Sequence, residues 1–447
     1  MRIYLESYGC TLNHGEARYL KDLLISSGHV FLENPEQADI VVLFSCCVIE
    51  TTELKMLRRA KRFSELGKPL IVSGCMAVVR RSALESAHDN VHFLPPREVS
   101  QINNVIEKIT EQAGFAFETE DATAEHEELQ YFRPLTDDLA EFESAGDFEE
   151  ELGESIDSIV PIATGCMGQC NYCITRLARG KLNSYSQSDI LSRITSAVSS
   201  GHYEVRLTAQ DTGCYGYDEH GNLAVLLNQI TKLHSEHDFR VRVGMLNPDS
   251  VKPILDELVE SFAGSRVFKF LHIPVQSGDD EMLAAMGRQY TVSEFFAIID
   301  KFRGKLPKLT ISTDIIIGYP NETEEQFNNS MTLLEQLKPN IVNITRFSAR
   351  PGTPAAGLRY TLAGKDVKAR SRAMTDLRFK ISKELNEREL GNTYRILITE
   401  RVKVGTVLGR TDNYLPVVVK KSLPLGIWLD VEIIEAVDSF LIGKEVV

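Results

Sequence analysis

The first hundred residues alternate between short apolar runs and longer amphipathic stretches. Three buried-type strands and two intervening helices are predicted, the strands at 2–7, 40–44 and 69–73 and the helices at 15–25 and 51–66. Strands that alternate with helices indicate a parallel sheet covered by helices. In such a sheet the carboxyl ends of the strands form one edge, and ligands bind there.

The same alternation returns near residue 158 and continues through six further β/α units. The six predicted strands are 158–164, 205–209, 240–245, 268–275, 310–317 and 340–347. Six units make an incomplete version of the eight-unit β/α barrel, in which sites lie at the carboxyl ends of the strands. Glycine-containing and polar segments follow most of these strands, so we expect the central site at that edge.

The pattern changes again near the C-terminus. A helix-like stretch rich in Lys and Arg covers 364–390, and five short strands follow it, at 394–400, 405–409, 415–419, 428–436 and 439–443. Short strands at close spacing are typical of a small β-barrel. The predicted architecture is α/β, with an N-terminal parallel sheet domain (1–114), a linker (115–155), a partial (β/α)6 barrel (156–388) and a small β-barrel (389–447).

The composition, 43% hydrophobic and 25% charged, is that of a globular domain protein. No apolar run approaches the roughly 18 residues that cross a bilayer, and the N-terminus lacks the pattern of a signal peptide, so we expect no membrane association and a cytoplasmic protein. The net charge of −14 lies in one segment, 118–154, which holds fifteen acidic residues and one basic residue, Arg133. The remaining chain is formally neutral, so the total charge does not argue against an RNA partner.

One cysteine loop carries the most specific chemistry. Cys166, Cys170 and Cys173 have the spacing C-x3-C-x2-C, and three thiolates on a tight loop can bind three irons of a [4Fe–4S] cube. The fourth iron then stays open to chelate the amino and carboxylate groups of S-adenosylmethionine (SAM). A zinc loop is the main alternative, but structural zinc usually takes a second cysteine pair, which this region lacks.

Three other cysteines each follow a predicted strand of the first domain: Cys10, Cys46 and Cys75. Because strand ends share one edge of the sheet, these residues are candidates for a second metal centre. Burial as small apolar side chains is the alternative for each of them. Cys47 competes with Cys46 as a ligand, whereas Cys214 is interpreted as a thiol that binds nothing.

Several polar side chains at or near strand ends are candidates for contacts to SAM or substrate, and capping of the following helix is the alternative role. The cofactor-binding candidates are Tyr172 (beside the adenine), Gln210, Asp211, Asn247, Gln276 and Asp314. Arg176, Arg179 and Lys181 follow the cysteine loop and are candidates for contact with substrate phosphates or for offsetting cluster charge. The basic stretch at 365–383 is interpreted either as an RNA site or as a solvated helix face.

The sequence resembles the radical-SAM methylthiotransferases along essentially its whole length. The resemblance rests on the three-cysteine loop, on three blocks around it and on a tail that resembles the RNA-binding TRAM domain. The blocks are Ser7-Tyr-Gly-Cys-Thr-Leu-Asn13, His272-Ile-Pro-Val-Gln-Ser-Gly278 and Thr313-Asp-Ile-Ile-Ile-Gly-Tyr-Pro320. In that family the cysteines matching Cys10, Cys46 and Cys75 hold an auxiliary cluster that carries sulfur. The resemblance therefore implies two [4Fe–4S] clusters together with SAM.

Residues 172–185 resemble the archaeal and eukaryotic branch of the family. The implied reaction is conversion of N6-threonylcarbamoyladenosine at tRNA position 37 to its 2-methylthio derivative, so the implied partners are the anticodon loop of tRNA and an electron donor protein. A different tRNA base or a ribosomal protein is the alternative substrate. A non-catalytic, metal-containing RNA-binding protein is the alternative from another class.

Overall fold

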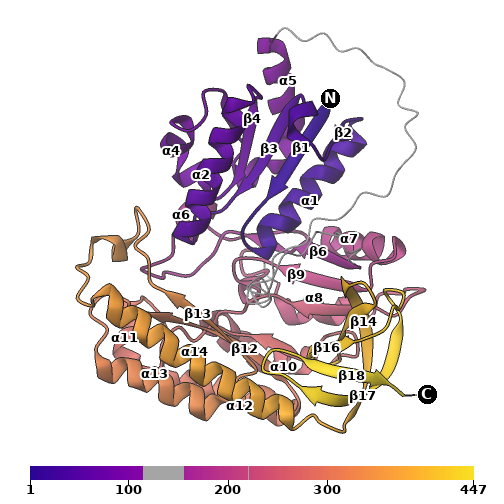
Figure 1. Ribbon diagram of the computed structural model, residues 1–447, viewed down its shortest axis with the longest axis vertical. Helices are drawn as coiled ribbons and strands as arrows, with labels where there is room; N and C mark the ends of the chain where they lie inside the picture. The colour runs from indigo at the N-terminus through magenta and orange to yellow at the C-terminus, as the bar shows by residue number, and fades with distance from the viewer. Residues whose placement is uncertain (114–155, 220, 447) are drawn as a thin grey trace.

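The structure, a computed structural model, describes residues 1–113, 156–219 and 221–446. Three bodies follow one another along the chain, with the N-terminal domain at the top of Figure 1, the central domain below it and the C-terminal barrel at lower right. The predicted acidic linker at 115–155 lies outside the described residues. Within these ranges, no helix has both the length and the apolar composition that a bilayer span requires.

The N-terminal domain is a five-stranded parallel sheet, as the sequence pattern predicts, with the order β2-β1-β3-β4-β5. The strands are β1 (Arg2–Ser7), β2 (Val30–Phe31), β3 (Ile40–Ser45), β4 (Leu70–Gly74) and β5 (Val91–Phe93). The helices are α1 (Thr11–Ser26), α2 (Glu50–Glu65), α3 (Met76–Val79), α4 (Arg81–Glu85) and α5 (Ile102–Ala113). The strand order reverses between β1 and β3, which is the position where open sheets of this type bind ligands.

The central domain is the predicted incomplete barrel. Two parallel sheets, β6-β9-β10 and β11-β12-β13, are joined through a parallel bridge from Val241 to Val267. The strands are β6 (Asp157–Pro161), β9 (Glu204–Thr208), β10 (Arg240–Val243), β11 (Phe270–His272), β12 (Thr310–Ile317) and β13 (Ile341–Arg346). The helices are α6 (Thr175–Arg179), α7 (Gln187–Ser199), α8 (Leu223–Thr231), α9 (Pro248–Val251), α10 (Leu255–Phe262), α11 (Asp280–Ala285), α12 (Val292–Lys305), α13 (Glu324–Leu337) and α14 (Gly364–Glu387).

Two of the predicted strands are shorter than the apolar runs suggested. The run 158–164 is interrupted after Pro161, and its end forms a separate hairpin, in which β7 (Ala163–Thr164) pairs with β8 (Asn183–Ser184). The run 268–275 keeps only three strand residues, and it contains Pro274, which has no N–H to donate to a neighbouring strand. Apolar character marks these segments as buried but does not show where strand pairing stops.

The C-terminal region closes into the predicted small barrel. Its five strands pair in the order β14-β15-β16-β18-β17, and β14 also pairs with β17. They are β14 (Thr393–Lys403), β15 (Thr406–Thr411), β16 (Pro416–Val419), β17 (Trp428–Ala436) and β18 (Leu441–Glu445). Closure leaves no free edge strand and buries a core that includes Ile396, Val417 and Val431.

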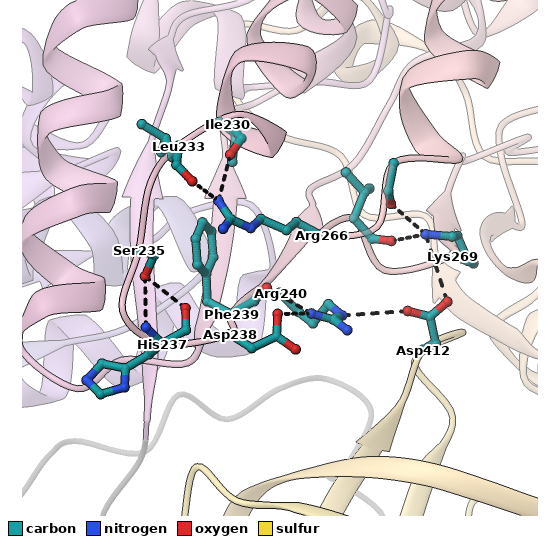
Figure 2. Close-up of polar contacts among 12 residues, drawn as sticks. Ile230, Leu233, Ser235, His237, Asp238, Phe239, Arg240, Arg266, Lys269 and Asp412 are labelled. Atoms are coloured by element: carbon teal, nitrogen blue, oxygen red, sulfur yellow. Dashed lines mark hydrogen bonds and ion pairs between the residues drawn. The ribbon is translucent and has the colours of Figure 1, made fainter.

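The barrel docks on the central domain at the amino ends of its strands. Asp412 faces Arg240 at the start of β10 and Lys269 just before β11, with N–O separations of 3.6 and 3.9 Å (Figure 2). At the start of β9, the Tyr414 hydroxyl donates to the buried Glu204 carboxylate at 2.5 Å. The C-terminal barrel therefore lies against the edge opposite to the carboxyl ends, where sites of β/α barrels form.

Candidate functional site

Three loops meet at the carboxyl edge of the N-terminal sheet, after β1, β3 and β4, and they carry Cys10, Cys46 and Cys75. The Ser45 carbonyl oxygen connects them, because it accepts hydrogen bonds from Asn13 Nδ2 at 2.9 Å and from the Cys75 N–H at 3.0 Å. The structure thus brings together three cysteine loops that are separated by about thirty residues each in the sequence.

Cys46 and Cys47 differ in their surroundings. The Cys46 sulfur lies against Gly9, where an added Cβ would be only 3.0 Å from it, and burial raises the pKa of Cys46 to about 12. Cys47 is fully buried in the core cluster that includes Leu43. A hydrogen bond from the Cys47 thiol lowers the pKa of Cys75. Cys46 therefore faces the loop of Cys10, and Cys47 faces the core.

The second cysteine loop connects β7 to α6. A Cβ added at Gly168 would lie 3.3 Å from the Cys166 sulfur and 3.6 Å from the Cys170 sulfur, so both sulfurs border the same small space. The loop begins at Gly165, whose φ of +78° belongs to the left-handed region. A Cβ there would meet the Lys181 carbonyl oxygen at 1.9 Å, so only glycine fits this turn.

The arrangement of the cysteines bears on the zinc alternative. In the described part of the chain, no three His, Cys, Asp or Glu side chains are grouped to hold a single metal ion. A zinc ion needs its thiolates around one centre, whereas a [4Fe–4S] cube spreads three thiolates over three irons. The described residues therefore offer no three-ligand arrangement for a single zinc ion.

Helix α6, which follows Cys173 directly, is built into the N-terminal domain. Its residues Ile174 and Ala178 pack in the same core cluster as Cys47 and Cys75. The side chain of Arg179 is completely buried there, donating to Glu16 Oε1 and to Asn13 Oδ1. The charge of Arg179 also lowers the pKa of Cys75. The substrate contact predicted for Arg179 does not fit this burial, because no RNA phosphate can reach the side chain.

The other two cations after the loop are placed differently. Arg176 and Lys181 are both exposed. The Lys181 carbonyl oxygen accepts a hydrogen bond from Arg97, which also donates to the Arg179 carbonyl oxygen at 3.0 Å. Arg97 thus fixes the backbone of this segment and leaves the two side chains at the surface.

A second buried ion pair joins the two domains. Arg350, in the loop after β13, contacts Glu53 of α2, and their side chains are only 6% and 7% exposed. Glu53 also pairs with Arg80. Together with the Arg179 pair, this contact restricts the rotation of one domain against the other.

Asp211, predicted to contact the cofactor, is satisfied by the protein itself. Its Oδ1 accepts from the backbone N–H groups of Gly213 and Asn247, each at 3.0 Å, and its Oδ2 accepts from the Ser250 hydroxyl. Burial raises the pKa of Asp211. This is the capping alternative: Asp211 holds the loops after β9 and β10 together.

A partly buried cation that no sequence motif singles out, Arg288, lies beside the central cysteine loop. Arg288 Nη1 donates to Asn247 Oδ1 at 3.1 Å, and its guanidinium lies 5.8 Å from the centre of the Tyr172 ring. Burial raises the pKa of Cys170, and the positive charge of Arg288 offsets part of that rise. Arg288 Nε and Gln210 Oε1 are both buried and have no hydrogen-bond partner among the described residues.

The last two predicted residues lie on the second sheet. Gln276 follows β11 with a φ of +71°, a strained conformation for a residue other than glycine. Asp314 accepts from His272 Nε2 at 2.9 Å and from Asn343 Nδ2 at 2.8 Å. These two partners keep the pKa of Asp314 below its ordinary value although burial raises it. Asp314 is therefore held by side chains from both strands that neighbour β12.

We predict that Arg179→Ala destabilises the chain by about 3–5 kcal/mol, because it leaves the Glu16 carboxylate buried without its cation. Thermal unfolding followed by circular dichroism measures this change. Arg176→Ala on the same helix is the matched control, and we expect it to change stability by less than about 0.5 kcal/mol. Equal effects of the two substitutions would show that Arg179 does not join the domains.

Comparison with known proteins agrees with these features. Residues 160–334 match the model of the radical SAM superfamily, residues 2–94 match an uncharacterized protein family named UPF0004, and residues 387–446 match the TRAM domain. Among solved structures, the radical S-adenosylmethionine methyltransferase TsrM of Kitasatospora setae is similar, with a TM-score of 0.57 at 12% identity over 79% of this chain and 75% of that chain. This likeness concerns the fold alone.

The relatives with curated names are similar over nearly the whole chain. The probable threonylcarbamoyladenosine tRNA methylthiotransferase of Pyrococcus horikoshii is 38% identical over 99% of this chain and 99% of its own length. The threonylcarbamoyladenosine tRNA methylthiotransferase of Xenopus laevis is 31% identical over 100% of this chain and 77% of its own length. This chain therefore belongs to the threonylcarbamoyladenosine tRNA methylthiotransferase family.

Proposed function

We propose that this protein is a radical SAM enzyme that converts N6-threonylcarbamoyladenosine, at position 37 in the anticodon loop of tRNA, to its 2-methylthio derivative. The observation that carries the proposal is the contact between the two cysteine regions: Ala178 of α6, the helix after the central cysteine loop, packs in the same core cluster as Cys75. The names of the relatives supply the nucleoside. The small barrel matching a TRAM domain supports an RNA substrate.

The central triad fits a [4Fe–4S] cube with one open iron, because the sulfurs of Cys166 and Cys170 border one space, the charges of Cys170 and Cys173 both act on Cys166, and no fourth cysteine lies on this loop. When bound, the cube and SAM supply a 5′-deoxyadenosyl radical. That chemistry matches the target, since C2 of adenine carries no acidic proton that a base could remove. The chain's own residues bind and orient the reactants around this step.

We assign SAM binding to the buried polar groups beside this loop. Arg288 offers an unpaired Nε–H and a full positive charge, which suit the SAM carboxylate. Gln210 offers an unpaired carbonyl oxygen, an acceptor for an amine or hydroxyl. Tyr172, held under the Arg288 guanidinium, provides an aromatic face for the adenine. Asn247 and Asp211 position these groups through their mutual hydrogen bonds, and Gln276 and Asp314 extend the polar lining on the second sheet.

We assign the sulfur-carrying cluster, and hence a second [4Fe–4S] cube, to Cys10, Cys46 and Cys75. Cys46 is preferred over Cys47 because its sulfur lies against Gly9, next to Cys10, and burial and the charges of both Cys10 and Cys75 raise its pKa, whereas the pKa of Cys47 responds to Cys75 and Cys46 and not to Cys10. Arg179 is the fixed cation beside these thiolates and offsets part of their negative charge. Exposed Arg176 and Lys181 are available to contact RNA phosphates or an electron donor protein near the cluster loop.

Cys166→Ala tests the function directly. We expect this variant to fold, but to release no 5′-deoxyadenosine and form no methylthiolated nucleoside when assayed anaerobically with dithionite, SAM and hypomodified tRNA. Cys214→Ala is the control, because Cys214 is a buried thiol in the same region that lies outside the C-x3-C-x2-C loop and donates to the Asp211 carbonyl oxygen at 3.1 Å. Product formed by the Cys166 variant would refute the cluster assignment. Product formed on ribosomes but not on tRNA would refute the substrate.

Arg288→Gln tests the SAM site by binding rather than by turnover. Loss of a charge-assisted hydrogen bond worth about 1.5–3 kcal/mol predicts SAM binding that is weaker by roughly 10- to 150-fold in equilibrium dialysis against the reconstituted protein. Arg176→Gln removes an exposed guanidinium from the same region and is expected to bind SAM like the wild type. Unchanged affinity in the Arg288 variant would remove this residue from the site.

A further inference from the structure

Helix α14 presents a row of exposed cations that the catalytic site does not use. Lys365, Lys368, Arg372 and Lys380 are exposed, and none has an ion-pair or hydrogen-bond partner among the described residues. Their spacings of three, four and eight residues place them on one face of the helix. Asp376 lies within this row, and Lys383 and Glu387 continue the same face as an ion pair, so the row itself carries four positive charges and one negative charge.

The opposite face of α14 is neutralised and packed. Arg370 pairs with Glu322 and Glu324, and Met374 and Ile381 are buried. The inward-facing arginine thus has carboxylate partners, while the outward row has none. A helix face needs only scattered charges to stay soluble, and these charges do not have to form a row without carboxylate partners. A row of four unpaired cations matches the regularly spaced charges of a polyanion.

The position of α14 indicates which polyanion it meets. Near its start, Val367 lies against Gly318 at the carboxyl end of β12, on the edge where sites of such barrels form. Near its end, Ser382 and Asn386 donate to backbone carbonyl oxygens of the β17–β18 turn, at Asp438 and Val437. Its 24 residues span about 36 Å.

The helix therefore extends from the active-site edge to the C-terminal barrel, along the lower side of Figure 1. The barrel itself docks at the amino ends of the strands, through Asp412, Arg240 and Lys269 (Figure 2). An RNA that enters the site and also contacts the barrel has to cross the side of the central domain, and α14 lies along that side.

We propose that the row Lys365, Lys368, Arg372 and Lys380 binds phosphates of the tRNA arm that delivers the target base. This inference rests on the proposed function, because it takes tRNA as the substrate. Contacts of this kind fix the register of the RNA between barrel and site without reading its sequence. The lysines and the arginine act here as point charges on phosphates, so binding through them has to weaken with salt.

The test is a fourfold substitution, Lys365→Gln, Lys368→Gln, Arg372→Gln and Lys380→Gln, in the full chain. Filter binding of an unmodified tRNA transcript is measured over a range of KCl concentrations. Each lost phosphate contact lowers the slope of log affinity against log salt by about 0.9. For four contacts we expect the slope to fall by about 3.6 and the affinity at 100 mM KCl to fall more than tenfold.

A control with the same change of charge separates a specific row from total charge. Four other exposed cations have no ion-pair or hydrogen-bond partner among the described residues, and they lie on α2, on α5 and at the end of α8: Arg58, Lys61, Lys108 and Lys232. Their replacement by Gln is expected to change the slope by less than 1. Circular dichroism of both variants verifies that they are folded.

Two results would overturn the inference: a row variant with the slope of the wild type, or a control that loses as much affinity as the row variant. Either result would leave the proposed function intact, provided that the wild type binds and modifies tRNA. A wild-type enzyme that binds no tRNA would overturn both.

Discussion

The buried contact of Arg179 with Glu16 and Asn13 is the interaction that relates the two cysteine sites. Arg179 ends the short helix that begins two residues after Cys173, and its partners lie on α1, which begins directly after Cys10. An uncompensated charge at this depth would be costly, so the two domains have to stay in register. Asn13 extends the constraint, because its amide also donates to the carbonyls of Tyr8 and Ser45.

The position of the two domains relative to each other has to be fixed if a reaction uses groups from both. In the function we propose, a radical formed at one site and sulfur held at the other have to meet the same carbon, and small displacements between reacting groups cost large factors in rate. The Arg350–Glu53 pair provides a second fixed point on another part of the interface. The polar lining around Arg288, Asn247 and Tyr172 is fixed within the central domain by its own hydrogen bonds. The RNA-facing parts are arranged around this core, with the barrel at the opposite edge and α14 between them.

The sequence pattern predicts most of the fold, because strand and helix periodicities are local properties. The parallel sheet, the six-unit barrel and the closing barrel are all found. The short edge strands β2 and β5 were not predicted, and two predicted strands end early near Pro161 and Pro274. The spacing of the cysteines and the ends of the strands also predict which loops meet. The ligand roles themselves remain predictions.

Side-chain partners were harder to predict because they depend on contacts distant in sequence. In the sequence, Arg179 resembles the two other cations that follow the central cysteine loop. Its burial depends on Glu16, a partner 163 positions earlier in the chain. Arg288 follows a short helix with no motif to single it out, and its role depends on Tyr172 and Asn247 from other strand ends. From the sequence, Asp211 could either cap the following helix or bind the cofactor. The three donors that its carboxylate accepts from within the protein favour the capping role.

We propose that the two cysteine triads hold two [4Fe–4S] clusters, one at the carboxyl edge of the N-terminal sheet and one in the loop before α6. Iron and zinc analysis of anaerobically reconstituted protein tests it most directly. We expect about eight irons per chain in the wild type. We expect about four when Ala replaces all three cysteines of one triad, which is either Cys10, Cys46 and Cys75 or Cys166, Cys170 and Cys173. About four irons in the wild type, or zinc in place of iron, would contradict it.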